Sequence, residues 1–189
     1  VYITNTEASA GHTAPRRDGS IKGMLPAAQL LNAGNLKDLG VKQITYNLLL
    51  GRITNGGGIN YQYNGKTYSF NSSYIGEYDT IARQMNAQGI QVTFIILNDL
   101  GADQTLIHPL SRGASANYYA LNAADQAGVE KLAAVASFLG QRYSDTGYGT
   151  VDNWIIGNEI NARNPWNFMQ TTDINQYAAE YANAFRIMY

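Results

Sequence analysis

Four short runs rich in apolar and β-branched residues constrain this chain more than any other feature of its sequence. They cover residues 1–5, 43–50, 90–97 and 151–157. The last three are nearly continuous apolar stretches, a pattern that is typical of strands buried on both faces of a sheet. The runs therefore predict strands at the centre of an α/β domain.

Helical patterns separate these runs and follow the last one. A helix is predicted over 25–39, with Pro26 in its first turn and Gly40 after its end. The other predicted helices are a stripe over 74–85, a helix that Asn122 caps and that runs to Leu139, and a stripe over 174–185. The order β-α-β-α-β-α-β-α predicts one domain, residues 1–189, of parallel strands joined by right-handed crossovers. Its functional sites are expected at the carboxyl ends of the strands.

A β-hairpin is predicted as an insertion after the second strand, over residues 59–70. Asn64-Gly65 is the strongest short signal for a two-residue hairpin turn. With that turn Tyr61 faces Tyr68, and the aromatic side chains share one face of the hairpin. This face either packs on the domain or forms a wall on which a sugar ring stacks, and packing is the favoured interpretation.

The charge balance and the composition exclude several classes of function. Lys and Arg number 13 and Asp and Glu 14, a formal net charge of −1, so the basic surface that nucleic-acid binding needs is absent. No apolar stretch approaches the roughly 18 residues of a membrane-spanning helix. Cysteine is absent and the two histidines, His12 and His108, are far apart in the sequence, so neither a metal centre nor another cofactor is predicted. The many Asn and Tyr residues suit a secreted or cell-surface bacterial protein that handles polar ligands.

The segment of greatest chemical interest covers residues 154–161, where an apolar strand runs into Gly157, Asn158 and Glu159. At the carboxyl end of a buried strand, Glu159 is expected in surroundings of low dielectric. Such surroundings disfavour a charged carboxylate and suit a general acid. Asn158 can hold a hydroxyl group through both its amide donor and its acceptor. Trp166 offers a flat apolar face for a sugar ring.

Other candidate ligand-binding residues follow the strands at the same predicted edge, namely Asn47, Asp99, Asn161 and His108. For Asp99, capping of the following turn is an equal alternative to a substrate contact. For His108, a loop histidine with satisfied hydrogen bonds is the favoured interpretation, and a role in a pocket is second. For Glu159, the alternative is a carboxylate that binds backbone amides.

A fourth strand that ends in Asn158-Glu159 resembles the clan A glycoside hydrolases, which are retaining (β/α)8 barrels. Through residues 44–50 and 154–160 the whole chain is also similar to the N-terminal part of an uncharacterised bacterial family of glycosidase-like barrels. The resemblance implies a parallel β/α barrel of TIM type with only four βα units present, a half barrel. It also implies that Glu159 is the general acid/base, that Asn158 binds the sugar 2-hydroxyl, and that the substrate is a polysaccharide.

The predicted half barrel lacks one catalytic group. A retaining glycosidase needs a second carboxylate about 5–5.5 Å from the acid/base, and in clan A it follows the seventh strand. We therefore expect this chain alone to be inactive. Half a barrel exposes apolar edges, so a missing C-terminal half or a second copy in a homodimer is expected to complete it, unless the sheet stays flat and doubly wound. The alternative function is a non-catalytic carbohydrate-binding or scaffold domain with the same site.

Overall fold

The structure, a computed structural model, describes residues 20–26, 32–144 and 146–189. Its centre is a four-stranded sheet in the order β1-β2-β5-β6, and every neighbouring pair is parallel. The strands are β1 (Gly23–Met24), β2 (Gln43–Leu49), β5 (Gln91–Leu97) and β6 (Asn153–Ile156). Because the strands follow sequence order across the sheet, right-handed crossovers place the connecting helices on one face. The predicted α/β class and parallel sheet are confirmed.

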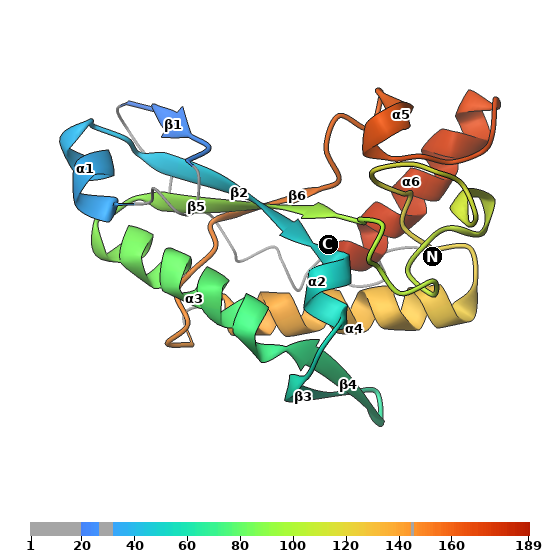
Figure 1. Cartoon of the computed structure of the whole chain (residues 1–189), viewed down its shortest axis with the longest axis horizontal. Coiled ribbons are helices and arrows are strands. Elements are labelled where there is room, and N and C mark those ends of the chain that lie inside the picture. The colour runs from blue at the N-terminus through green and yellow to red at the C-terminus, as the bar shows by residue number, and fades with distance from the viewer. Residues whose placement is uncertain (1–19, 27–31, 145) are drawn as a thin grey trace, which may run out of the picture.

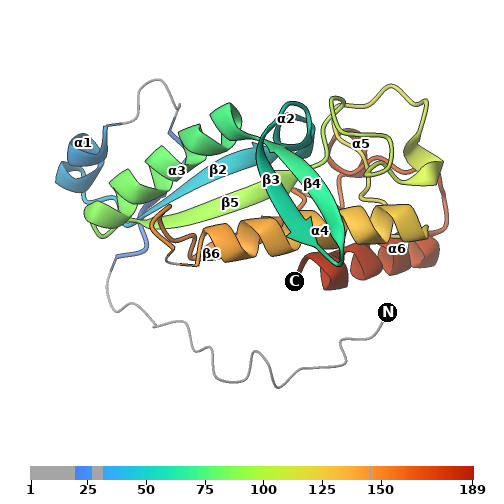
Figure 2. The same ribbon diagram turned by 90° about the horizontal axis from the view of Figure 1, so that it is seen from below.

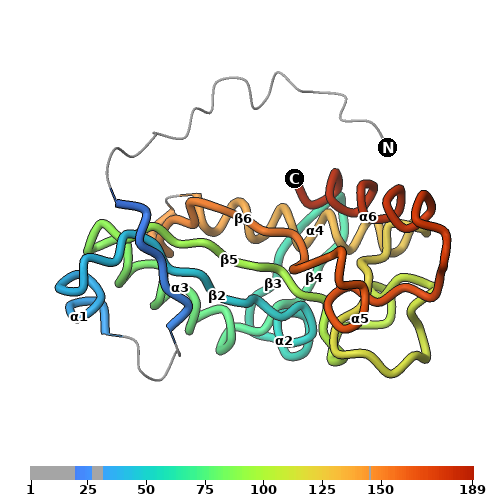
Figure 3. The backbone as a smooth tube through the Cα atoms, turned by 90° about the horizontal axis from the view of Figure 1, so that it is seen from above, coloured from blue at the N-terminus to red at the C-terminus, as the bar shows by residue number. Residues whose placement is uncertain are grey.

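The three long helices, α3 (Ser72–Ala87), α4 (Gln126–Arg142) and α6 (Ile174–Met188), cover one face of this sheet. The other described helices are α1 (Ala33–Asp38), α2 (Leu50–Thr54) and α5 (Arg163–Trp166), with a 3-10 turn at Pro109–Ser111. Figures 1 and 2 show α3 and α4 along the same side of the strands and α6 beside α4. Figure 3 shows the sheet from its other side, with the strands in front of these helices. In β2, Ile44 and Leu48 are buried under the helices, whereas Thr45 and Asn47 are half-buried on the face without them.

The first βα unit differs from the prediction. The predicted strand over residues 1–5 lies outside the described residues, and the strand that pairs with β2 is β1. Of the predicted helix 25–39, residues 27–31 also lie outside them. The described helix, α1, begins after Asn32, whose side-chain oxygen accepts the amide hydrogen of Asn35 at 3.0 Å. This N-cap satisfies a donor of the first turn, and it lies well inside the range predicted as helix.

The start of α4 also differs from the prediction. Asp125, and not Asn122, caps this helix, because its Oδ1 accepts the amide hydrogen of Gly128 at 2.8 Å. The Asn122 amide instead donates to Asp125 Oδ2 at 2.9 Å and orients that carboxylate. A side chain at position 128 would collide with Asn122. The helix therefore begins one turn later than predicted.

The predicted hairpin is confirmed with its register. Strands β3 (Gly58–Tyr63) and β4 (Lys66–Asn71) pair antiparallel, and Tyr61 lies opposite Tyr68. Both turn residues have positive φ, 47° at Asn64 and 74° at Gly65, as a type I′ turn requires.

The aromatic face of this hairpin packs on α4. The Phe70 ring stacks on Phe138 with centroids 4.3 Å apart, and Tyr61 meets the edge of Phe138 at 5.5 Å. The Tyr61 hydroxyl lies 2.7 Å from Ser137 Oγ. The packing interpretation is therefore confirmed, and this face is not a wall for a sugar.

Candidate functional site at the carboxyl edge of the sheet

The loops that follow β2, β5 and β6 meet at one edge of the sheet. Parallel strands end at the same edge, so α2, the loop over 98–125 and the loop over 157–173 gather there. The two long loops are joined by backbone hydrogen bonds, with Tyr118 N donating to Pro165 O at 3.2 Å and Phe168 N donating to Tyr118 O at 3.0 Å. This edge is the candidate site.

Glu159 follows β6 at this edge and has a left-handed backbone conformation, with φ 41°. Its carbonyl oxygen accepts the amide hydrogen of Ala162 at 2.7 Å, which closes the turn that leads into α5. The side chain is exposed. The expected surroundings of low dielectric are therefore not found, because the chain turns away from the sheet at Gly157, where φ is 76°.

Two tyrosines of α6 hold the loop after β6 in place. The Tyr177 hydroxyl donates to Ile160 O at 2.6 Å and accepts from Asn167 Nδ2 at 2.7 Å. The Tyr181 hydroxyl donates to Ile156 O at 2.8 Å. Burial raises the pKa of both tyrosines, so both stay neutral donors. Their helical spacing in the sequence predicts only core packing, so this role follows from the folded structure alone.

Trp166 stacks on Tyr118, with ring centroids 5.2 Å apart and an interplanar angle of 4°. Both rings are half-buried. Tyr118 also forms an isolated antiparallel bridge with Asp99, just beyond the end of β5. The predicted aromatic surface at this edge is thus a pair of rings contributed by two loops. Tyr118 was missed because it lies in a long loop without any periodic pattern.

Asp99 organises the backbone around it. Its Oδ1 accepts the amide hydrogen of Gly51 at 2.6 Å and its Oδ2 accepts that of Gly101 at 3.3 Å. A side chain at position 51 would collide with the backbone of Gly101 and with Asp99 itself. The capping alternative therefore accounts for Asp99.

The asparagines at the edge have different surroundings. Asn47 is half-buried on the sheet face without helices, Asn158 is half-buried in the turn after β6, and Asn161 is exposed. Asn98 is buried and donates to Leu106 O at 2.9 Å and Ala120 O at 3.1 Å. Asn47 and Asn158 are thus half-exposed and available to a ligand, whereas Asn98 serves the loop.

His108 is buried, with 2% of its surface exposed. Its Nδ1 accepts the amide hydrogen of Leu110 at 3.1 Å, and its Nε2 lies 3.5 Å from Glu180 Oε2 without a hydrogen bond. Burial lowers the pKa of His108, and the nearby Glu180 carboxylate opposes that shift. His108 is thus a buried loop histidine whose Nδ1 is satisfied, whereas its Nε2, unlike in the favoured interpretation, has no hydrogen-bond partner.

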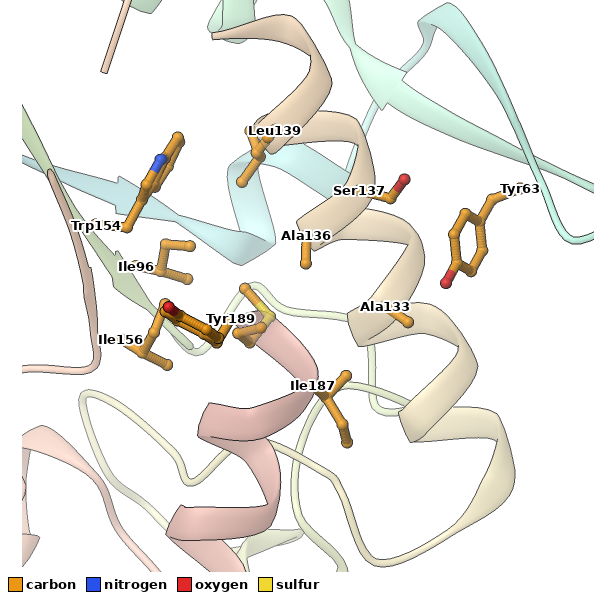
Figure 4. Close-up of a pocket in the computed structure, with 12 residues that line it drawn as sticks. Tyr63, Ile96, Ala133, Ala136, Ser137, Leu139, Trp154, Ile156, Ile187 and Tyr189 are labelled. Atoms are coloured by element: carbon orange, nitrogen blue, oxygen red, sulfur yellow. The ribbon is translucent and has the colours of Figure 1, made fainter. Parts of the chain in front are cut away.

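A cavity of about 450 Å³ lies apart from this edge, between the sheet and helices α4 and α6. Figure 4 shows Ile96, Trp154 and Ile156 facing α4 and the end of α6 across it. Most of the residues that line it are apolar, the Ser137 hydroxyl is already engaged by Tyr61, and the other lining hydroxyls belong to Tyr63 and Tyr189. No carboxylate, histidine or basic side chain of the described residues lines it.

Within the described ranges, no cluster of three or more His, Asp or Glu side chains is arranged to hold a metal ion. No helix of that part of the chain is long and apolar enough to cross a membrane.

Comparison with known proteins identifies a family. Residues 14–189 match the model described as "Family of unknown function (DUF5722)". No curated protein and no solved structure matches the chain. Because the match covers nearly the whole sequence, the chain belongs to the DUF5722 family.

Proposed function

We propose that this chain is the first half of a (β/α)8 barrel of the glycoside hydrolase type, which binds a polysaccharide along the carboxyl edge of its sheet. In this proposal Glu159 is the general acid/base, and Asn158 and Trp166 contact the sugar. The nucleophile comes from outside the chain. The observation that carries the proposal is the left-handed conformation of Glu159 directly after the fourth parallel strand.

Backbone strain supports a functional role for Glu159. Among the described residues only Asn64 and Glu159 combine a side chain with a positive φ. Asn64 lies in a hairpin turn that favours Asn, whereas Glu has no such preference for the left-handed region. Strained residues of this kind cluster at functional sites, where they aim a side chain.

The sheet also supports the half barrel. Four parallel strands in sequence order with helices on one face match the arrangement of the first four strands of a (β/α)8 barrel. Ile155 of the edge strand β6 is 42% exposed on the face without helices. A second half that covered this face would also bury Glu159 and thereby disfavour its charged form.

The second candidate function is a non-catalytic carbohydrate-binding domain. The exposure of Glu159 favours it, since an exposed carboxylate lacks the surroundings of a general acid. Asp99 is not available as a second catalytic carboxylate, because both of its oxygens accept hydrogen bonds from backbone amides. This also favours a non-catalytic domain. Only the stacked Tyr118 and Trp166 rings and the neighbouring asparagines would then act.

The test begins with the 189-residue chain. We expect it to bind neutral oligosaccharides without hydrolysing them, and we expect Trp166→Ala to weaken binding at least tenfold, because tenfold corresponds to about 1.4 kcal/mol of lost stacking. Glu130→Gln is the control, because the Glu130 carboxylate pairs with Lys66 of the hairpin and belongs to α4 rather than to the edge loops. Hydrolysis by the chain alone would contradict an external nucleophile, and an unchanged response of the edge-loop amides to the oligosaccharide in Trp166→Ala would contradict the edge as the site.

The complete product of the gene separates the two candidates. As the acid/base, Glu159 should contribute about 10²–10⁴-fold to hydrolysis. Glu159→Gln is therefore expected to lower the rate by that factor while binding is kept. A complete product that binds but never hydrolyses supports the non-catalytic domain.

A further inference from the structure

A second groove, of about 840 Å³, lies on the helix-covered side of the sheet between β2 and α3. Its volume is in the range of small-ligand sites, which is roughly 300–1,000 Å³. One wall is the exposed flank of α3, formed by Ser73, Glu77, Thr80 and Gln84. Because these side chains are polar, the groove suits a polar ligand better than an apolar helix or strand.

Two tyrosines form a fixed floor. The Tyr74 hydroxyl accepts the amide hydrogen of Leu49 at 3.0 Å and donates to the Tyr78 hydroxyl at 3.0 Å, and Tyr78 in turn donates to Asn47 O. Burial raises the pKa of both tyrosines. Their hydroxyl groups are thus committed to β2, and their rings cannot leave the groove without breaking this chain.

Tyr46 also lines the groove, but its hydroxyl has no hydrogen-bond partner. The residue is 6% exposed. A buried hydroxyl without a partner is unfavourable, and native structures usually satisfy such groups with protein or a bound molecule. Among the described residues, β1 pairs only with Gln43 and Ile44 of β2, so at position 46 β2 has a strand neighbour, β5, on one side.

Arg52 lies at the rim of the groove with its guanidinium 4.5 Å from the Tyr74 ring centroid. This stacking fixes the group and leaves the N–H bonds in its plane free to donate. Arg52 is exposed and makes no ion pair within the described part of the chain. Glu77, also exposed, lines the same groove and supplies an acceptor.

We propose that this groove is a second carbohydrate-binding site, which takes a neutral oligosaccharide and satisfies the Tyr46 hydroxyl with a sugar hydroxyl. A neutral polyol fits because each hydroxyl both donates and accepts, and the groove offers a cationic donor and an anionic acceptor together. The groove is distinct from the loop that carries Glu159, because that loop follows β6 and β5 lies between β6 and β2; α2, which carries Arg52, borders both the groove and the edge.

The test uses the whole chain and a panel of neutral hexasaccharides of glucose, mannose and xylose. Binding is followed by calorimetry and by amide chemical shifts over α3. We expect one hexasaccharide to shift these amides and Tyr46→Phe to weaken that binding at least tenfold. The Tyr46→Phe protein remains folded, with a melting temperature unchanged or raised by roughly 2–4 °C, because an unsatisfied buried hydroxyl has been removed.

Tyr148→Phe is the matched control, since Tyr148 lies on Arg142 away from the groove. Trp166→Ala tests the edge separately and is expected to leave the α3 shifts unchanged. Unchanged affinity in Tyr46→Phe, shifts confined to the edge loops, or no response of α3 to any hexasaccharide would each overturn the second site. Loss of the α3 response in Trp166→Ala would also overturn it, because the two sites would then not be independent.

Discussion

Glu159 shows how a single residue can depart from what its sequence neighbours predict. The apolar strand before it predicts burial, but the left-handed turn at positions 157 and 159 carries the side chain into solvent. The energetic cost of the positive φ at Glu159 arises from its backbone conformation and not from the carboxyl group. The free energy of unfolding can therefore measure this cost separately from catalysis.

Replacement of Glu159 by glycine is expected to stabilise the chain by about 1 kcal/mol, because glycine adopts positive φ without steric cost. The free energy of unfolding in urea measures this. Gly157→Ala is a control in which the opposite effect is expected. It should destabilise the chain, because the new Cβ would lie 3.2 Å from Ile160 Cγ2 at a residue whose φ is 76°. A Glu159→Gly protein less stable than the wild type would show that the side chain contributes more than the strain costs.

His108 is expected to make stability fall in acid. Burial lowers its pKa from the ordinary 6.5, so the folded protein favours the neutral ring. The unfolded chain takes up the proton first, and the free energy of unfolding should therefore decrease as pH falls below about 6.5 and stay level above it. Other charged groups near the ring are Glu180, Arg112 and Asp125.

Urea unfolding between pH 5 and pH 8 measures this effect. His108→Asn retains an acceptor for the Leu110 amide hydrogen but does not titrate. The free energy of unfolding should therefore depend on pH less steeply in the variant than in the wild type, and only below about pH 6.5. Equal slopes at all pH values would assign the acid sensitivity to other groups.

At the scale of elements, the hairpin is held to the domain by aromatic packing. Phe70 is 1% exposed and stacks on Phe138 of α4. Phe70→Ala removes a buried ring and leaves a cavity, and we expect a loss of about 3–5 kcal/mol in the free energy of unfolding. Ser69→Ala, on the opposite and exposed face of β4, should change stability by less than about 0.5 kcal/mol. A small effect of Phe70→Ala would mean that the hairpin moves independently of α4.

At the scale of the whole molecule, the sheet has, in the described part of the chain, one face without helices and an apolar edge. Ile155 of β6 is 42% exposed on the same face as Ile95 of β5. Unprotected apolar edges of this kind attract another chain. We therefore predict that the isolated chain self-associates and that Ile155→Lys raises the dissociation constant at least tenfold in sedimentation equilibrium.

Ile174→Lys is the control for that experiment, because Ile174 is 71% exposed at the start of α6 and is not part of the sheet. A wild-type chain that sediments as a monomer at every concentration would contradict association through β6.

Much of the fold could be predicted from local patterns. The spacing of apolar residues predicts the three later strands and helices α3 and α6, and the Asn-Gly turn predicts the register of the hairpin. Both signals depend on residues that are close in the sequence. The starts of α1 and α4 were placed wrongly, because several residues there can cap a helix and only the folded backbone selects Asn32 and Asp125. Asn158, Glu159 and Trp166 follow β6 at the carboxyl edge of the sheet, as the strand order predicts, and their role in a site stays a prediction.

The sequence by itself determined the parallel α/β order and the edge at which polar residues gather, because both depend on the alternation of apolar strands and helices. Only the tertiary structure decided how these residues are used. It stacked Trp166 on Tyr118, engaged Asp99 with backbone amides, buried His108 against Glu180 and left Tyr46 without a hydrogen-bond partner. The physical reason is that burial and hydrogen-bond partners depend on contacts between residues distant in the chain, which no local pattern encodes.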